Sequence, residues 1–241
     1  MGYNRCSNIL RMPQNESIAN LATKPEDYYS QQRPEVLGFI PPSARRILDV
    51  GCGEGGFGAQ VKRKLGATVW GIELMPSIAD RARERLDRVI AGDILDQLEQ
   101  LPDGYFDCIT FNDVLEHLID PYRVLRAVKL KLSPSGVVVA SIPNIRFLRN
   151  LFNLVVRGDW RYEDAGILDK THVRFFTKKS IKSMFESLGY RIIQLKGINA
   201  TPSWKVAFFN LATLGAFSDT RYLQFCCIAE PLRDSNVAGQ S

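Results

Sequence analysis

The chain has 241 residues, of which 45% are hydrophobic and 24% are charged, as expected for a globular protein large enough for one α/β domain with its own core. The first thirty residues are polar and no run of eighteen apolar residues occurs, so neither a signal peptide nor a membrane span is expected. The formal net charge of +5 comes from basic residues scattered along predicted helices, which does not indicate a nucleic-acid groove.

Residues 1–43 are interpreted as an N-terminal extension with helical pieces, closed by Pro41 and Pro42. After it, short apolar runs alternate with helical patterns. This alternation predicts a parallel sheet with crossover helices, in an α/β domain over residues 44–230. The predicted strands are 46–50, 68–73, 89–93, 106–111 and 137–142, the helices are 57–65, 76–86 and 122–132, and a turn is predicted at 133–136.

The strand–helix alternation is interrupted over residues 143–176, which we interpret as an irregular insert that carries acceptor specificity. A helix over 178–188 follows and ends at Gly189, the residue type that commonly terminates helices. Two late strands, 190–197 and 222–229, are candidates for an antiparallel pair at the sheet edge. Between them, the apolar stretch 204–217 is interpreted as core or as a lid, and residues 231–241 as a tail.

The five cysteines form neither a CxxC pair nor a zinc-binding spacing. An odd number of cysteines in apolar surroundings indicates buried, reduced thiols. We therefore expect a cytoplasmic protein.

A glycine-rich segment, LDVGCGEGG over residues 48–56, follows the first predicted strand. Glycines at this point allow a tight turn and let backbone N–H groups approach a ligand at a helix N-terminus. Such a turn is compatible with S-adenosylmethionine (SAM) and also with a nicotinamide or flavin dinucleotide, because Gly51, Gly53 and Gly56 loosely fit the G-x-G-x-x-G spacing.

Carboxylates at the ends of the first three strands favour SAM. Asp49 lies inside the strand before the glycines, where it can order the loop or bind the cofactor's ammonium but would repel a pyrophosphate. Glu73 ends the second strand and can accept both ribose hydroxyls, a role shared with dinucleotide folds. Asp93 ends the third strand and can accept from an adenine amino group. Taken alone, Glu73 or Asp93 could instead be a carboxylate in a loop or a helix cap with no ligand to bind.

The chain resembles the class I SAM-dependent methyltransferases, in particular the branch of ubiquinone-type O-methyltransferases and bacterial polysaccharide-cluster methyltransferases. The resemblance covers roughly residues 28–198 and is carried by ILDVGCGEGGFG (47–58), VWGIE (69–73), AGD (91–93), FDCITFNDVLEHLIDP (106–121), LSPSGVVVASIPN (132–144) and GILDKTHVRFFT (166–177).

This resemblance implies a three-layer, Rossmann-like sheet of about seven strands, mostly parallel, with the last strand antiparallel. It also implies that Tyr28 or Tyr29 covers the methionine end of the cofactor, with helix packing as the alternative. The SAM site that it implies is formed by Gly51, Cys52, Gly53, Glu73, Leu74, Asp93, Ile94 and Asn112.

The chain contains two histidines, His117 and His172, and we expect the acceptor near them. If the segment after the fourth strand is helical, Asp113, Glu116 and His117 share one helix face. One histidine could then act as a general base, oriented by Arg174 or Asp113. Alternatively, a divalent metal could be held by two carboxylates and two imidazoles, those of Asp113, Glu116, His117 and His172. Such a ligand set would suit Mn²⁺, Fe²⁺ or Zn²⁺ better than Mg²⁺.

Similar carboxylate–His metal sites occur in small-RNA 2′-O-methyltransferases and ubiquinone-type enzymes, although Asp113 stands where the former have Glu. The structural alternative is that Glu116 and His117 pack the segment, that His172 is a hydrogen-bonded structural residue and that Asp113 is a helix N-cap. Arg174 could bind an anionic acceptor group or anchor the insert.

These observations predict a SAM-dependent methyltransferase, most simply an O-methyltransferase acting on a hydroxyl of a small molecule, without nucleic acid as partner. A sugar or polysaccharide precursor as acceptor is implied by the resemblance alone. A nicotinamide-dependent oxidoreductase and a non-catalytic SAM-binding or nucleic-acid module are the alternatives.

Overall fold

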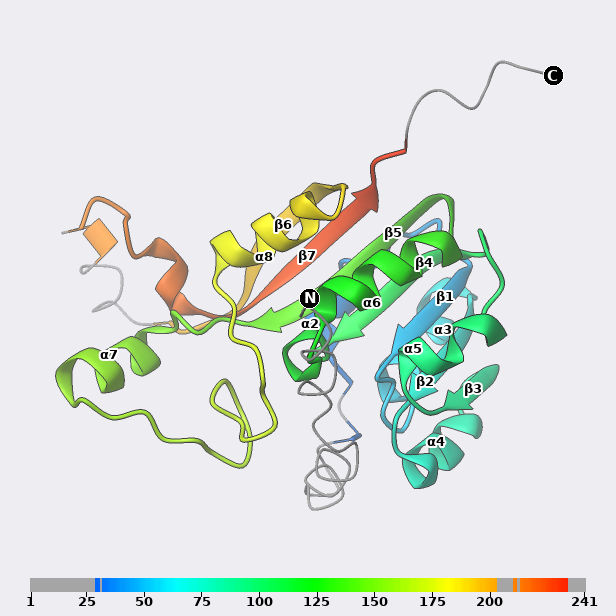
Figure 1. The fold of residues 1–241 in the computed structure, drawn as a ribbon, viewed down its shortest axis with the longest axis horizontal. Helices are drawn as coiled ribbons and strands as arrows, with labels where there is room; N and C mark the ends of the chain where they lie inside the picture. Colours follow the sequence, from blue (N-terminus) through cyan, green and yellow to red (C-terminus); the bar gives the residue numbers. More distant parts are fainter. Residues whose placement is uncertain (1–28, 31, 203–209, 212, 234–241) are drawn as a thin grey trace, which may run out of the picture.

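A computed structural model describes residues 29–30, 32–202, 210–211 and 213–233 of the chain. Seven strands form one sheet in the order β3-β2-β1-β4-β5-β7-β6 (Figure 1). Strands β1 to β5 pair in parallel, whereas β7 runs antiparallel to both β5 and β6. This order and the antiparallel β7 confirm the predicted fold class. The strands are β1 (Arg46–Val50), β2 (Thr68–Glu73), β3 (Arg88–Ala91), β4 (Phe106–Asn112), β5 (Leu132–Pro143), β6 (Tyr190–Ala200) and β7 (Tyr222–Pro231).

Helices cover both faces of the sheet, which gives the three layers. One hydrophobic core contains buried residues of α5, α6 and α8, and the other contains those of α2, α3 and α4. The central strands are buried on both sides, as shown by Ile47 and Leu48, which are adjacent in β1 and both fully buried. The helices are α2 (Pro34–Leu37), α3 (Gly56–Leu65), α4 (Pro76–Arg83), α5 (Ile94–Gln97), α6 (Pro121–Val128), α7 (Leu148–Val156) and α8 (Lys178–Ser187).

The segment predicted as a turn at 133–136 belongs to β5, so that prediction is wrong. The register against β4 shifts between the pairs Phe106–Leu132 and Cys108–Val137, which marks a bulge. A Cβ on Gly136 would lie 2.6 Å from the carbonyl oxygen of Phe106, so the bulge brings two backbones into contact where only glycine fits. The preceding helix is also shorter than predicted, because α6 ends at Val128 and a 3-10 turn, Lys129–Lys131, follows.

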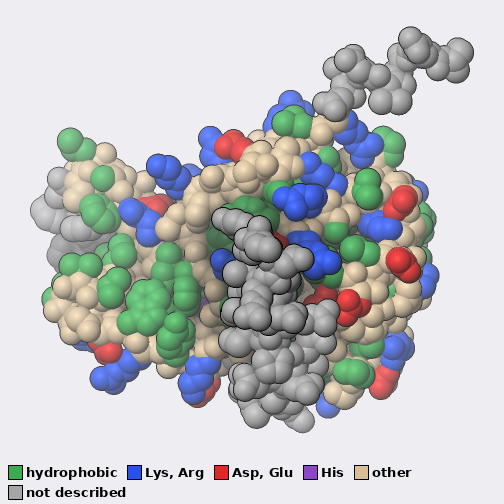
Figure 2. All heavy atoms as spheres, viewed as in Figure 1, with side chains coloured by type: hydrophobic (Ala, Val, Ile, Leu, Met, Phe, Trp, Pro, Cys, Tyr) green, Lys and Arg blue, Asp and Glu red, His purple; other side chains and the backbone are tan. Residues whose placement is uncertain are grey.

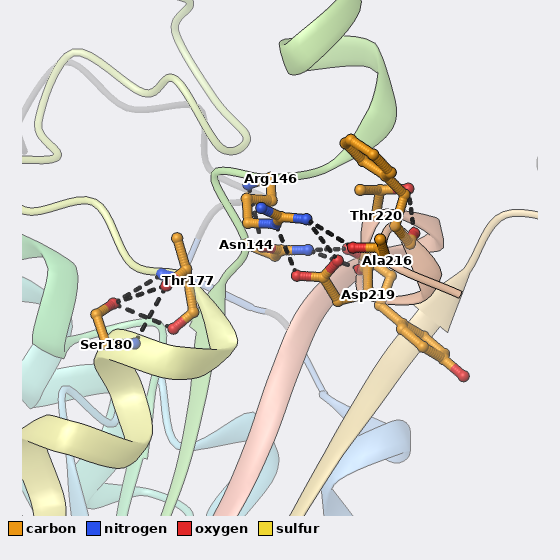
Figure 3. Close-up of polar contacts among 9 residues, drawn as sticks. Asn144, Arg146, Thr177, Ser180, Ala216, Asp219 and Thr220 are labelled. Carbon is orange, nitrogen blue, oxygen red and sulfur yellow. Dashed lines mark hydrogen bonds and ion pairs between the residues drawn. The ribbon is translucent and has the colours of Figure 1, made fainter. Parts of the chain in front are cut away.

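The insert is not irregular throughout, because it contains α7. Polar contacts fasten its first residues to the 3-10 turn Ser218–Arg221 before β7 (Figure 3). The guanidinium of Arg146 donates from Nε to Asp219 at 2.8 Å, and the amide of Asn144 donates to the Asp219 carbonyl at 3.0 Å. Most apolar residues of α7 are turned outward, with Val155 78% exposed, and hydrophobic side chains gather over the insert in Figure 2.

The late strands form the antiparallel pair predicted for the sheet edge, with β6 outermost. A capping box between Thr177 and Ser180 starts α8 (Figure 3). Gly189 lies in the left-handed region, with φ 70°, just beyond the end of this helix. The interpretations of residues 1–28 and of most of the tail fall outside the described residues, as does much of the stretch 204–217.

No helix among the described residues is long and apolar enough to cross a membrane. Of the five cysteines, the four that the structure describes have free, buried thiols, as predicted: Cys52, Cys108, Cys226 and Cys227. On the face shown in Figure 2, Lys and Arg side chains are dispersed and interspersed with acidic ones.

Candidate functional site

A cavity of about 760 Å³ opens at the carboxyl ends of the parallel strands. This is the edge at which open α/β sheets bind ligands. Its lining includes all nine predicted cofactor-binding residues: Asp49, Gly51, Cys52, Gly53, Glu73, Leu74, Asp93, Ile94 and Asn112.

The glycine-rich loop can be built only from glycine at two of its positions. Gly51 and Gly53 have φ values of 70° and 54°, in the left-handed region. A Cβ on Gly51 would lie 2.5 Å from the Val114 side chain, and one on Gly53 would lie 2.5 Å from the carbonyl oxygen of Tyr29. The loop therefore packs tightly against both the N-terminal segment and the segment after β4.

Glu73 joins the end of β2 to this loop. Its carboxylate accepts a hydrogen bond from the Gly53 N–H at 2.9 Å and another from the Met75 N–H at 3.0 Å. Burial raises its pKa, and these hydrogen bonds oppose that shift. Each carboxylate oxygen can accept a further hydrogen bond, so Glu73 combines an ordering role in the loop with acceptor capacity at the cavity.

Asp49 is 2% exposed and lies beneath the loop. Its carboxylate accepts from Thr110 Oγ1 at 2.6 Å and from Asn112 Nδ2 at 3.4 Å. Burial raises its pKa to about 7, only partly offset by these hydrogen bonds. The other amide atom of Asn112, Oδ1, is buried without a hydrogen-bond partner among the described residues, so a ligand ammonium would find an acceptor here.

The remaining cofactor-side residues follow β3 and the N-terminal segment. Asp93 caps α5, because its Oδ1 accepts from the Leu95 N–H at 2.8 Å. The alternative role of a helix cap is therefore observed for this oxygen. The residue also lines the cavity. Tyr29 lines the cavity as well, and burial together with the Glu73 charge raises its pKa to about 12. Tyr28 lies outside the described residues.

The acceptor-side expectation of a shared helix face is wrong. Only a 3-10 turn, Leu115–His117, forms after β4, and Asp113 precedes it in the left-handed region with φ 53°. Its carboxylate accepts from Gln224 Nε2 at 2.7 Å, is hydrogen-bonded by Ser141 at 3.2 Å and is paired with Arg33. Asp113 therefore does not cap the turn, whose N-cap is Val114, and it shares no helix face with Glu116 and His117, although its charge lies near Glu116.

Glu116, His117 and His172 come together at the cavity. Each offers one ligand atom, and these atoms all lie within 4.8 Å of one another. The two imidazole centroids are 4.6 Å apart. Both carboxylate oxygens of Glu116 are buried without a hydrogen-bond partner among the described residues, and burial together with the nearby Asp113 charge raises its pKa well above the ordinary range.

This cluster has the composition of a general-base site or of a divalent-metal site. One carboxylate and two imidazoles suit Mn²⁺, Fe²⁺ or Zn²⁺. Oε1 of Glu116 lies 3.9 Å from His172 Nε2, beyond hydrogen-bond distance, so a cation or an acceptor hydroxyl would supply the partner that the carboxylate lacks among the described residues. Asp113 is absent from the set because Arg33 and Gln224 bind its carboxylate.

Arg174 does not line the cavity. Its guanidinium donates to the Ile119 carbonyl oxygen from Nε at 3.1 Å and from a terminal nitrogen at 2.6 Å. The backbone amides of Val173 and Arg174 both donate to the Glu116 carbonyl oxygen at 3.0 Å. These contacts are those of the alternative expectation, in which Arg174 anchors the insert, and its role in orienting a histidine or binding the acceptor stays a prediction.

Sequence reasoning missed the polar chain that closes the cavity beside Asp113. Asn199 Nδ2 donates to Gln224 Oε1 at 2.9 Å, and Gln224 in turn donates to Asp113, which pairs with Arg33. Arg33 and Asn199 both have left-handed backbones, with φ values of 47° and 53°. These residues come from distant parts of the chain, so no local spacing could have revealed them.

Comparisons with known proteins agree with this geometry. The model of a family described as "Methyltransferase domain" matches residues 22–195. A ubiquinone biosynthesis O-methyltransferase of Xanthomonas axonopodis is 26% identical over 204 residues, which is 79% of this chain and 79% of that protein. A Coxiella burnetii enzyme of the same name is 26% identical over 171 residues, which is 68% of this chain and 70% of that protein.

Solved structures share the fold. A SAM-dependent methyltransferase from Archaeoglobus fulgidus has a TM-score of 0.60 at 21% identity, covering 85% of this chain and 96% of that chain. One from Mesorhizobium loti has a TM-score of 0.55 at 20% identity, covering 81% and 95%.

Proposed function

Because the chain belongs to the class I SAM-dependent methyltransferases, whose domain model covers residues 22–195, we propose that it transfers the methyl group of SAM to a hydroxyl of a small molecule or of a sugar or polysaccharide precursor. The observation that carries this proposal is one continuous cavity. Its lining joins the glycine loop, with Asp49 and Glu73, to the Glu116–His117–His172 cluster, in which Glu116 and His172 are buried and His117 is half-buried.

On the cofactor side, each part of SAM has a complementary partner. Glu73 accepts from the ribose hydroxyls, and the oxygen of Asp93 that does not cap α5 accepts from the adenine amino group. Asp49 and Asn112 Oδ1 face the ammonium of the methionine part. Asp49, next to the glycine loop, would repel the pyrophosphate of a nicotinamide dinucleotide when ionised, which favours the methyltransferase over the oxidoreductase.

On the acceptor side, the cluster supports removal of a hydroxyl proton. The acceptor oxygen forms a bond to the methyl carbon as the bond from that carbon to sulfur breaks, and the products are the methyl ether and S-adenosylhomocysteine. The hydroxyl proton passes to an imidazole Nε2 of the cluster. Alignment and water exclusion are the other contributions required of the protein, since the sulfonium already activates the methyl group.

The same three residues are also suited to hold a divalent cation. Such a cation would bind the acceptor hydroxyl and lower its pKa. The two routes are separated by adding a chelator and then Mn²⁺ or Zn²⁺: turnover that is lost and restored supports the metal, and turnover that a chelator leaves unchanged supports the general base.

The first experiment measures cofactor binding and chemistry separately. Calorimetry should detect binding of SAM and not of NAD. Release of S-adenosylhomocysteine should occur with a phenol or sugar hydroxyl in an acceptor panel and not with matched amines. Binding of NAD would support the oxidoreductase, and tight SAM binding without turnover on any acceptor would support a non-catalytic module.

The Glu73→Ala variant should bind SAM more weakly by about 1–3 kcal/mol, or about 5- to 150-fold, because the ribose hydroxyls lose a charged partner. Calorimetry with SAM measures the change. Glu99→Ala, which removes an exposed carboxylate outside the cavity, is the control. An affinity equal to that of the parent chain removes Glu73 from the site.

The His172→Ala variant should retain the SAM affinity of the parent chain but lose about 10²–10⁴-fold in turnover, because the cluster acts on the acceptor and not on the cofactor. Calorimetry and release of S-adenosylhomocysteine provide the two measurements. If SAM affinity fell by as much as turnover, His172 would act on the cofactor and its assignment to the acceptor side would be wrong.

A further inference from the structure

The two imidazoles of the cluster are held through their Nδ1 atoms by one short segment of the insert, residues 167–172. His172 Nδ1 lies 2.9 Å from the carbonyl oxygen of Ile167. His117 Nδ1 lies 3.2 Å from the carbonyl oxygen of Thr171 and 3.1 Å from its hydroxyl oxygen. A carbonyl oxygen can only accept, so each of these contacts favours a proton on Nδ1.

The Thr171 hydroxyl adds to this preference through Asp169. Asp169 is 1% exposed, and its Oδ1 accepts from the Thr171 hydroxyl and from the Thr171 N–H, both at 2.8 Å. A hydroxyl has one hydrogen, and here that hydrogen points to the carboxylate. The lone pairs of the hydroxyl therefore remain for His117 Nδ1, so both oxygens of Thr171 that face this nitrogen act as acceptors.

We propose that Asp169 and Thr171 are positioning residues that fix His117 as the tautomer with its proton on Nδ1 and its lone pair on Nε2. This inference rests on the proposed function, in which Nε2 accepts the acceptor proton or binds a cation. It assigns a role within the cluster to two residues of the insert, Asp169 and Thr171, that transfer no proton themselves.

Backbone contacts place this segment independently of the Thr171 hydroxyl. The His172 N–H donates to the Asp169 carbonyl oxygen at 3.0 Å, and the amides of Val173 and Arg174 are bound to the Glu116 carbonyl oxygen. Removing the hydroxyl should therefore leave the segment in position and take away one of the two acceptors that face His117 Nδ1, while the Thr171 carbonyl oxygen stays.

The test exploits the presence of only two histidines in the chain. Long-range ¹H–¹⁵N NMR of the full-length protein at pH 8, with a chelator present, identifies the protonated nitrogen of each ring, and His172→Gln assigns the signals. We expect His117 of the parent chain to be protonated on Nδ1. In Thr171→Val, signals of the Nε2-protonated form should appear, and kcat with the best acceptor of the panel should fall about 10- to 100-fold with KM little changed.

Thr171→Ser keeps the hydroxyl and should restore the parent tautomer and kcat. Asp169→Asn should lie between the parent and Thr171→Val, because an amide no longer dictates where the hydroxyl hydrogen points. Thr68→Val, at an exposed position at the start of β2, is the control for loss of a threonine hydroxyl, and thermal unfolding verifies that each variant is folded.

Two results would overturn the positioning role: an Nε2-protonated His117 in the parent chain, or an unchanged tautomer and kcat in folded Thr171→Val. A His117→Ala variant that turns over as fast as the parent chain would also overturn it, because the tautomer of His117 would then have no effect on the chemistry. The proposed function fails by a different measurement, the absence of S-adenosylhomocysteine release by the parent chain with every hydroxyl acceptor of the panel.

Discussion

Replacing Glu116 with glutamine is expected to lower turnover by about 10²–10³-fold while raising the free energy of unfolding by about 1–3 kcal/mol at pH 8. The carboxylate is 1% exposed, and neither oxygen has a hydrogen-bond partner among the described residues. Burial raises its pKa, so the folded state bears the cost of desolvating the charge or of taking up a proton. Glutamine has the same shape and carries no charge, so its amide costs less to desolvate than a carboxylate, but it can neither accept a proton nor bind a cation tightly.

Urea unfolding and release of S-adenosylhomocysteine measure the two effects on the same preparations. Glu163→Gln is the matched control, since Glu163 is on the insert and its side chain is 51% exposed beside Arg149. That variant should change neither quantity appreciably. A Glu116→Gln variant that is both less stable and unchanged in turnover would identify Glu116 as a structural residue and would remove it from the cluster's chemistry.

The fold and the cofactor side could be predicted because the signals are local. Strands buried on both faces have apolar runs, and parallel strands place their carboxyl ends at one edge of the sheet. Residues at successive strand ends, such as Asp49, Glu73 and Asp93, therefore line one cavity although they are far apart in sequence. The prediction needed only the strands and their direction.

The acceptor side depends on contacts that no local pattern contains. The side chain of Asp113 is bound by Gln224, 111 residues away, and its backbone is left-handed, so a helical spacing rule misplaced it. Sequence could not decide between the two roles expected for Arg174, because an arginine that binds an acceptor and one that binds a carbonyl oxygen have the same sequence signal; in the structure it donates to the Ile119 carbonyl oxygen. Helix α7 was missed because most of its apolar residues are exposed, with Phe152 48% exposed, whereas Asn150 is buried.

The Asp49→Asn variant should have a higher unfolding free energy than the parent chain at pH 8, by about 2–4 kcal/mol. The pKa of Asp49 is raised from 3.8 to about 7, chiefly by burial. Between these values the folded state binds more protons than the unfolded state, so the contribution of Asp49 to stability falls as pH rises through this window and is constant above it. The stability gain of the variant should therefore grow from pH 4 to pH 7 and then level off, as urea unfolding across this range would measure.

The SAM affinity of the parent chain should rise with pH, in contrast to the contribution of Asp49 to stability, which falls. An ammonium near Asp49 stabilises the ionised carboxylate, so SAM affinity of the parent chain should be about tenfold weaker at pH 6 than at pH 8. Asp49→Asn should bind weakly at both values and lose this pH dependence, because asparagine does not titrate. Asp87→Asn is the control, as that carboxylate lies outside the cavity and its pKa is lowered. A parent chain whose SAM affinity does not change between pH 6 and pH 8 would show that Asp49 orders the loop without meeting the cofactor's charge. The buried carboxylate would then be a cost to stability without a matching gain in binding.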